Sequence, residues 1–599
     1  MTDPQTVRQV EPVSGFTLTG GEMLDHSDRA AARADHAGLE LARRAVEAAE
    51  GPVLLIGPTA SLLLEDLSPE RAVSVLVRGT VDARSLQHSR DLHEGLSVHC
   101  GSLDRFDTSA HAVVVALDPL RMLVTPDSRP LSCRESLALM AGFTAESGVL
   151  VAEVSNSLGI NDLQTAPSVL ARDNFDHLAG EAAGGLFRHE LAGALDHADL
   201  NLARCFAAVP SATHPVVLVR DDSLADEELV QFAKTFTSAV AVDPGPGPRT
   251  LSDPTMLTER MFDARLAAEL APAWIVMWTH GDADDLQVPR AVAVEPETAA
   301  GWRARVVVDD DDDRHALGGL VASGVVERDL SRAYAGERGA LVETMLTDAC
   351  RVRDLTGVRH VVAAYGAWLM SLPAPEAIVA TVDNTVCRTD GDSVTFGLFD
   401  PSWTVSVETT SEAALARNLW RFAQRLLRRS FAHPWVADAG ADQITDSLCA
   451  MVGVDWTSTR ESSVALEERL RASLGSAADN GFARLTTPGA REMDAQDPRS
   501  ASWRETVRAN AELREELAVN RERIDWLERH LEWRDRQFAG LEKRMNTVTA
   551  TTAYKVTDAL GAPKRKAVKS ARALVMDQLP PGFKDKAEKA VRRMLNDAT

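Results

Sequence analysis

The chain has 599 residues, a hydrophobic content of 45%, a charged content of 25% and a formal net charge of −24 at pH 7. This length is too great for one hydrophobic core, so we expect several folded domains of ordinary globular composition. The negative charge excludes general nucleic-acid binding by the whole molecule, because an acidic surface repels phosphate.

Cysteine usage and the N-terminus bear on compartment and targeting. No two cysteines form a Cys-x-x-Cys pair, which disfavours a structural zinc site and a disulfide framework. The N-terminal sequence MTDPQTVRQVEPVSG lacks the basic and apolar regions of an export signal, and no apolar run is long enough to span a bilayer. We therefore expect a cytoplasmic protein with buried, reduced thiols.

From residue 51 to about residue 219, short apolar runs alternate with helical patterns, which is typical of a parallel α/β sheet. Strands are predicted at 53–56, 73–77, 97–100, 112–117 and 148–154, with a late pair at 202–207 and 216–219. Helices are predicted at 61–67, 81–92, 132–143 and 189–200. Together these elements predict a Rossmann-like domain at 51–241, after an N-terminal extension at 1–50, with its ligand at the carboxyl ends of the strands.

The middle of the chain shows two changes of composition. A Pro/Gly-rich stretch at 242–254 is typical of a linker, and mixed helix and strand patterns predict an α+β domain at 255–474. A second polar and unpatterned linker is expected at 475–502.

A seven-residue repeat predicts a long coiled coil at 503–549. One core position holds Asn510, Leu517, Ile524, Leu531, Phe538 and Met545, and the other holds Leu513, Asn520, Leu527, Arg534, Leu541 and Val548. The polar residues in this seam can fix register and strand number, which favours a homo-oligomer formed through 510–548. The alternative is a single helix folded back on the protein's own domains.

Residues 551–599 hold eleven Lys or Arg and five Asp or Glu, so the end of an acidic chain is basic. Basic and apolar side chains recur at helical spacing within 555–595, which predicts amphipathic helices that bind an anionic membrane surface. We expect a protein that is peripheral to the inner face of the membrane. Docking of this tail onto the acidic body of the same protein is the alternative.

Four segments within about 51–219 carry a family resemblance: AVVVALDPLRMLVTPDS, GVLVAEVSNSLGINDL, GGLFRHELAGALDHADL and VPSATHPVVLV. They resemble class I S-adenosylmethionine-dependent methyltransferases, and in particular those of bacterial cell-surface polysaccharide clusters. The resemblance implies S-adenosylmethionine as the cofactor and a methyl transfer that depends mainly on orientation of the reactants.

The resemblance also implies where the cofactor would be held. Glycines after the first strand, a carboxylate after the second and an aspartate after the third are usual there, for the methionine, ribose and adenine parts. The candidate cofactor-binding residues of this chain are Gly57, Thr59, Asp82, Ser102 and Asp104. Arg78 stands where the ribose carboxylate is usual, and Ser155 where a glutamate is usual. Asp118, after the fourth strand, is the candidate to orient or deprotonate a hydroxyl acceptor, and its alternative role is to cap the turn before Pro119.

The segment TVDNTVCRTDGDSVTFGLFDPSW at 381–403 resembles the catalytic loop and metal aspartate of kinase-like folds. That resemblance implies Mg²⁺ held by Asn384 and Asp400, whereas a simple hairpin with polar ends is the alternative. No convincing glycine-rich loop or phosphate-pairing lysine precedes the segment, so phosphotransfer is not expected. The order of methyltransferase, kinase-like region, coiled coil and basic tail resembles the chain-terminating methyltransferase-kinases of O-antigen synthesis.

Two functions follow from these patterns. One is a membrane-associated methyltransferase of surface-glycan biosynthesis that O-methylates a glycan. The other is a catalytically silent scaffold that recruits glycosyltransferases to the membrane through its coiled coil and basic tail.

Overall fold

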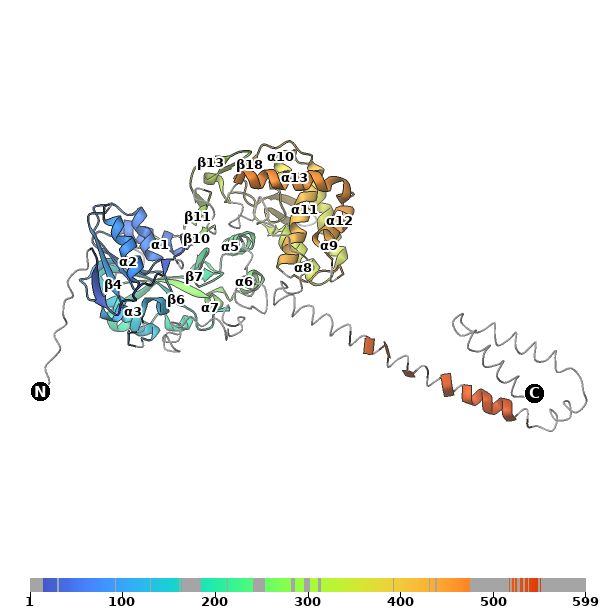
Figure 1. The fold of residues 1–599 in the computed structure, drawn as a ribbon, viewed down its shortest axis with the longest axis horizontal. Helices are drawn as coiled ribbons and strands as arrows, with labels where there is room; N and C mark the ends of the chain where they lie inside the picture. Colours follow the sequence, from blue (N-terminus) through green and yellow to red (C-terminus); the bar gives the residue numbers. More distant parts are fainter. Residues whose placement is uncertain are drawn as a thin grey trace, which may run out of the picture. The chain divides into compact units, whose positions relative to one another are not determined.

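The structure is a computed structural model, drawn in Figure 1. It describes residues 15–474, apart from 30–31, 92, 126, 130, 161–162, 164–184, 213, 241–253, 282–285, 296–301, 311–313, 391–392, 430 and 437–438, and it describes a part of 517–550. The chain divides into two compact units, Met1–Thr506 and Val507–Thr599.

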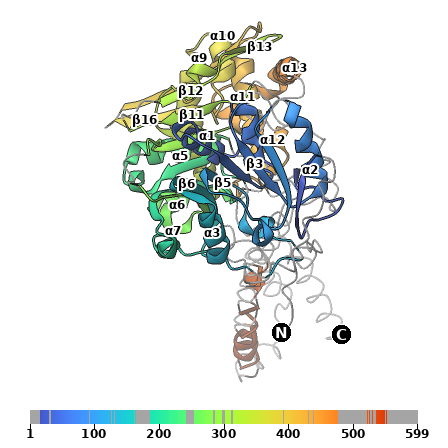
Figure 2. The same ribbon diagram turned by 90° about the vertical axis from the view of Figure 1, so that its left-hand side faces the viewer.

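A twelve-stranded sheet runs through the first unit in the order β1-β4-β3-β2-β5-β6-β9-β7-β8-β10-β11-β12 (Figures 1 and 2). Its parallel part consists of β1 (Thr17–Gly20), β4 (Leu96–Gly101), β3 (Val73–Val77), β2 (Val53–Ile56), β5 (His111–Ala116) and β6 (Thr144–Ser155). The inner strands are almost wholly apolar because helices cover both faces of the sheet, as is usual for parallel strands. Numbered from β2, the order is 3-2-1-4-5, which is that of a Rossmann sheet.

The strand β9 (Ala273–Thr279) lies between β6 and β7 (Asn201–Val209) and is antiparallel to both, so β7 runs in the same direction as β6. All of its residues, AWIVMWT, are buried. The sequence predicts a separate domain from residue 255, but the structure inserts this later segment into the middle of the first sheet. Apolar periodicity identifies a buried strand and does not say which sheet the strand joins.

The rest of the large sheet is antiparallel and contains strands from before and after the predicted boundary at 242–254. It consists of β8 (Val217–Arg220), β10 (Ala291–Val294), β11 (Arg305–Val308) and β12 (Arg314–Leu317). The Rossmann-like part and the following α+β part therefore share one sheet.

Helices pack on both faces of the parallel strands. Apolar residues of α1 (Gly38–Ala48) and α2 (Thr80–Gln87) pack in the core on one face, and those of α3 (Cys133–Gly142) pack on the other (Figure 1). The helix predicted at 189–200 is wrong, because the described chain forms only short 3₁₀ turns there. Asp199 takes a left-handed backbone conformation, with φ of 54°, which ends any helical path before β7.

The segment once predicted as a separate domain adds helices and two small sheets to the unit. Its sheets are β13 (Leu320–Ser323), β14 (Val326–Asp329) and β18 (Trp403–Val405), and β15 (Ala340–Leu341), β16 (Thr385–Asp390) and β17 (Ser393–Leu398). Its helices are α6 (Pro254–Asp263), α7 (Ala267–Leu270), α8 (Val342–Arg351), α9 (Leu355–Met370), α10 (Ala374–Val379), α11 (Ser411–Arg428), α12 (Ala441–Met451) and α13 (Trp456–Leu474), and α5 (Glu227–Ala239) precedes the segment. The helices from α8 onward bury a core of their own, with β14 and β18 at its edge.

The described residues of the second unit are helical. Six apolar residues of the predicted seam are more than half exposed, namely Leu517, Ile524, Leu531, Phe538, Leu541 and Met545. The coiled coil itself stays a prediction, and the linker at 475–502 and the basic tail at 551–599 lie outside the described residues. Among the described helices, none is long and apolar enough to cross a membrane.

Candidate functional site

The strand register brings several candidate loops to one edge of the sheet. Ile56 at the end of β2 pairs with Leu76 of β3 on one side and with Ala116 of β5 on the other. The loops that follow these strands therefore leave the sheet at the same edge. The strand order reverses between β2 and β5, and ligands of open α/β sheets bind outside the carboxyl ends at such a point.

Gly57 and Asp118 meet at this reversal point. Gly57 has a φ of +93°, and a Cβ there would lie 2.4 Å from Asp118 Oδ2, so glycine is required on both grounds. Thr59 donates its backbone N–H to Asp118 Oδ2 at 3.0 Å and its hydroxyl to Oδ1 at 2.6 Å. Burial raises the pKa of Asp118 to about 6, and the hydrogen bonds from Thr59 partly oppose that rise. Both oxygens of Asp118 thus fasten the loop after β2, instead of capping the turn before Pro119.

Arg78 follows β3, at the position where the family resemblance implies a ribose carboxylate. Its Nε and Nη2 donate to the two oxygens of Asp28 at 2.7 and 2.8 Å, and its Nη1 donates to the carbonyl of Val124 at 3.0 Å. Burial opposes ionisation of Asp28, but the bonds and charge of Arg78, with a smaller effect of His26, outweigh it and hold the pKa of Asp28 below its usual value. A two-bond ion pair occupies the ribose position.

The other candidate cofactor residues are also engaged by the chain. Asp82, in the first turn of α2, accepts hydrogen bonds from the Ser27 hydroxyl and, at 2.7 Å, from the backbone N–H of Asp28. Ser102 donates to Asp104 at 2.7 Å, and Asp104 also accepts from the backbone N–H of Arg129 at 3.3 Å. The structure therefore brings the predicted residues to one edge and joins them to groups of the protein itself.

A bound S-adenosylmethionine would need acceptors at this edge for its ribose hydroxyls and its adenine amine. The carboxylates of Asp28, Asp82, Asp104 and Asp118 each accept hydrogen bonds from this chain's own donors. The side chain at the ribose position is a cation, Arg78, instead of an acceptor. In this arrangement, the residues do not fit a bound cofactor.

The sequence interpretation missed a buried acid–base cluster at the same edge. Glu153 of β6 lies 3.4 Å from His36 Nε2, and Asp35 pairs with His214 of the loop between β7 and β8. The backbone N–H of Gly38 donates to His36 Nδ1 at 3.0 Å, so Nε2 carries the proton and donates to Glu153. Burial, and next the charge of His214, lowers the pKa of His36 to about 3, so this imidazole is neutral. The glutamate in the otherwise apolar run GVLVAEV was the available signal.

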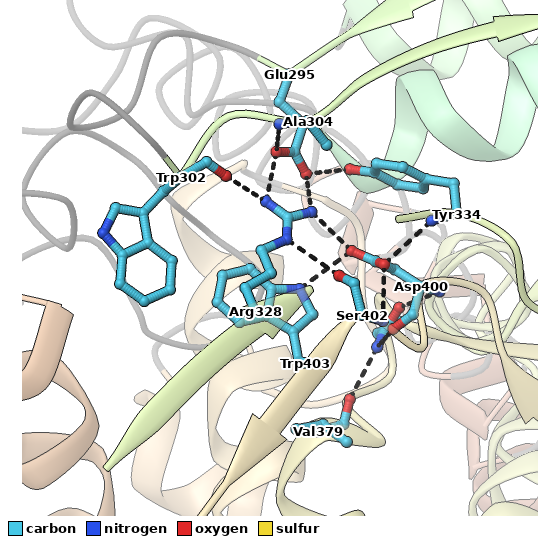
Figure 3. Close-up of polar contacts among 10 residues, drawn as sticks. Glu295, Trp302, Ala304, Arg328, Tyr334, Val379, Asp400, Ser402 and Trp403 are labelled. Carbon is cyan, nitrogen blue, oxygen red and sulfur yellow. Dashed lines mark hydrogen bonds and ion pairs between the residues drawn. The ribbon is translucent and has the colours of Figure 1, made fainter. Parts of the chain in front are cut away.

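Of the predicted magnesium ligands, Asn384 lies directly before β16 and Asp400 lies just after β17. Figure 3 draws the contacts of Asp400. Asn384 donates to the carbonyls of Val379 and Asp400, each at 3.0 Å, and its Oδ1 accepts from the Asp400 backbone N–H at 2.9 Å. Oδ2 of Asp400 accepts from Arg328 at 2.9 Å and from the Trp403 indole at 3.1 Å. Both side chains serve the fold as hydrogen-bond partners.

Arg328 occupies the place that a metal ion would need beside Asp400. It is fully buried, and it also donates to both oxygens of Glu295 at 2.6 and 2.8 Å (Figure 3). Mg²⁺ would have to displace this guanidinium from a fully buried carboxylate, so the arrangement opposes the predicted metal site. Within the part of the chain that the structure describes, no group of three or more His, Cys, Asp or Glu could hold a metal ion.

Comparisons with known proteins add no argument to the strand order. No protein-family model and no curated protein matches the sequence. The N-methyltransferase NodS from Bradyrhizobium japonicum WM9, solved with S-adenosyl-L-homocysteine, is 19% identical over 20% of this chain and 61% of its own, with a TM-score of 0.17. The CcbJ methyltransferase from Streptomyces caelestis is 14% identical over 43% of this chain and 93% of its own, with a TM-score of 0.24.

CalS10 from Micromonospora echinaspora, an amino pentose methyltransferase with bound S-adenosylmethionine, is 22% identical over 19% of this chain and 48% of its own, with a TM-score of 0.15. The match thus spans less than two thirds of NodS and of CalS10. At TM-scores of this size the strand order is the stronger observation. The mixed sheet, with its parallel 3-2-1-4-5 strands, fits a Rossmann-like fold.

Proposed function

We propose that this chain is an S-adenosylmethionine-dependent methyltransferase-like protein of bacterial cell-surface polysaccharide biosynthesis, with O-methylation of a glycan as its activity. The observation that carries the proposal is the reversal of strand order between β2 and β5, with Gly57 and Asp118 directly outside it. Open α/β sheets bind their ligands outside the carboxyl ends of the strands at such a reversal point. The glycan acceptor is inferred from the sequence segments that resemble polysaccharide-cluster methyltransferases.

Calorimetric titration of the full chain with S-adenosylmethionine and with S-adenosylhomocysteine tests the cofactor. Saturable binding at micromolar concentration supports the proposal. No heat and no shift in unfolding temperature at millimolar concentration of either compound contradicts it. Purified chain incubated with radiolabelled methyl donor and surface-glycan extract then tests the class of acceptor.

The second candidate is a catalytically silent scaffold, and the Asp28–Arg78 ion pair favours it. Arg78 is a cation at the position implied for the ribose, and Asp28 binds it. A Rossmann-like sheet that no longer binds a cofactor can carry such an ion pair. The same titration separates the two candidates. If the chain is a scaffold, it should bind neither compound and should still capture glycosyltransferases that are encoded in its own gene cluster.

The membrane part of the proposal depends on the basic composition of 551–599. The full chain should sediment with phosphatidylglycerol vesicles and not with phosphatidylcholine vesicles, and added salt should release it. Deletion of 551–599 should abolish this sedimentation. If the deleted chain still sediments equally, the membrane role of the tail is wrong.

A further inference from the structure

The residues that precede α1 were predicted as an extension, but a part of them lies on the candidate cofactor edge. Residues 20–29, called here the N-terminal strap, begin at the end of β1 and continue past the ends of β4 and β3. The backbone N–H of Ser102, after β4, donates to the carbonyl of Gly20 at 3.0 Å. The backbone N–H of Met23 donates to the carbonyl of Arg78, after β3, at 2.8 Å. The strap thus contacts the two loops that would hold adenine and ribose.

The strap also covers the N-terminus of α2. Its carbonyls at Met23 and His26 accept from the backbone N–H groups of Thr80 at 3.1 Å and Val81 at 3.3 Å. Those N–H groups have no partner within the helix and need one from elsewhere. The backbone N–H of Asp25 donates to the Thr80 hydroxyl at 3.0 Å. The first turn of α2 is therefore capped by the strap's backbone.

Two glycines allow the strap to approach this closely. A Cβ on Gly79 would lie 2.4 Å from the carbonyl oxygen of His26, which is a backbone atom and cannot turn aside. A Cβ on Gly21, whose φ is +74°, would lie 2.9 Å from the Ser102 hydroxyl. Side chains at these positions would separate the strap from the sheet. The strap therefore packs closely against the sheet, and this close packing requires glycine at both positions.

Asp28 is the main polar anchor of the strap. Its carboxylate binds Arg78 through two hydrogen bonds, and its N–H binds Asp82 at 2.7 Å. It is 8% exposed, so the pair is shielded from water, and such pairs hold better than exposed ones. Release of Asp28 would leave Arg78 with only the carbonyl of Val124 and Asp82 with only the hydroxyl of Ser27 among these partners.

We propose that the N-terminal strap is an autoinhibitory device, which closes the nucleoside part of the methyl-donor pocket until it is displaced. This inference rests on the proposed function and accounts for the engagement of Arg78 and Asp82 by the chain's own groups in the closed arrangement. A ligand that binds only the open form loses apparent affinity in proportion to the fraction of open molecules. A chain that is open about 1% of the time would bind about a hundredfold more weakly than an open chain.

The test uses the full chain and the variant Asp28→Ala, with Asp66→Ala as a matched control. Asp66 forms a short ion pair with Arg43 in the same unit, outside the strap. Hydrogen exchange followed by mass spectrometry reports opening of residues 20–29 independently of any ligand, and titration with S-adenosylhomocysteine reports the pocket. We expect faster exchange in the strap and an affinity gain of about tenfold or more for Asp28→Ala, with neither change in the control.

Four results would overturn the proposal. Unchanged exchange in Asp28→Ala would mean that this anchor does not hold the strap. Faster exchange without a gain in affinity would mean that the strap does not obstruct the pocket. Equally tight binding of S-adenosylhomocysteine by the unaltered chain and by Asp28→Ala would rule out the strap's inhibitory role, but the proposed methyltransferase function would stand. Absence of binding in an opened variant would rule out both. If Asp28→Ala does not fold, Asp28→Asn keeps the shape and one hydrogen bond, and the same readouts apply.

Discussion

Thr59 and Asp118 are joined by two hydrogen bonds that span the reversal point of the sheet, one from a backbone N–H and one from a hydroxyl. Both side chains are buried, so neither donor of Thr59 has water as a substitute. Asp118→Ala should therefore destabilise the first unit by about 2–6 kcal/mol, from about 1–3 kcal/mol for each of the two buried donors left unsatisfied. Denaturant unfolding followed by tryptophan fluorescence measures this loss. Asp107→Ala, at an exposed position, should change stability little, and an equal loss in both variants would contradict the assigned role.

The raised pKa of Asp118 predicts a pH dependence of known sign. The pKa rises from 3.8 to about 6 on folding, so the folded chain holds a proton that the unfolded chain releases between these values. The associated stabilisation is present below the lower value and is lost as the pH rises through about 6. Asp118→Asn lacks this titration. As the pH rises from about 4 to about 7, the unfolding midpoint of the unaltered chain should decrease relative to that of Asp118→Asn. A constant difference across that range would argue against a buried, titrating Asp118.

His36 predicts the opposite dependence. Its pKa falls from 6.5 to about 3 on folding, so acid protonates the unfolded chain first and destabilises the fold between these two values. His36→Gln retains an acceptor for Gly38 and a donor for Glu153, and it removes the titration. Its acid slope should be shallower by up to about 1.4 kcal/mol per pH unit, which corresponds to one proton. Thermal unfolding at a series of pH values measures the slope, with His88→Gln at an exposed position as the control. Parallel slopes for the unaltered chain and His36→Gln would refute the interpretation.

Arg328 joins the large sheet to the β14–β18 sheet through buried ion pairs with Glu295 and Asp400. Arg328→Met would leave two buried carboxylates without their cation and should destabilise the fold by about 3–5 kcal/mol or more. The further change Asp400→Asn should restore a part of this loss, because it removes one of those charges. Arg351→Met, which breaks an exposed pair with Asp348 in α8, should cost less than about 1 kcal/mol. The unfolding midpoints of the unaltered chain and the three variants measure these differences. A similar loss of stability in Arg328→Met and Arg351→Met would contradict the role assigned to Arg328.

The parallel half of the sheet could be predicted because its strands are unbroken apolar runs between turn residues. The predicted strands 53–56 and 73–77 agree with β2 and β3 to the residue. The place of β9 could not be predicted, since any buried strand has the same apolar pattern and only tertiary packing selects its neighbours. The sequence indicates that the candidate residues lie on loops at one edge of the sheet, but it does not indicate which groups of the chain they bind. Asp28 and His36 lie in a segment without apolar periodicity, and they contact residues 50 and 117 positions away.

The exposed seam of the second unit predicts a specific mode of self-association. Ile524 and Leu531 are more than half exposed at heptad spacing, and Arg523 and Glu528 flank them. In a parallel, in-register coiled coil, a residue before one core position faces the residue five positions later in the partner chain, so Arg523 would face Glu528 of a second copy. The sequence repeats this complementarity, because Glu516 stands five residues before Arg521 and His530 five before Asp535. Charge therefore favours two identical chains that run in the same direction.

Charge reversal can test this arrangement in the full chain. Arg523→Glu alone and Glu528→Arg alone each place like charges opposite each other in a parallel pair, so sedimentation equilibrium should show weaker self-association of each variant. An equal mixture of the two variants should associate again as a heteromer. In it the glutamates at 523 and 528 of one chain face the arginines at 528 and 523 of the other. A helix folded back on the body would make all these chains monomeric. Met545→Cys adds a check on direction, since only parallel, in-register chains bring the two new thiols together, while the native cysteines are all buried.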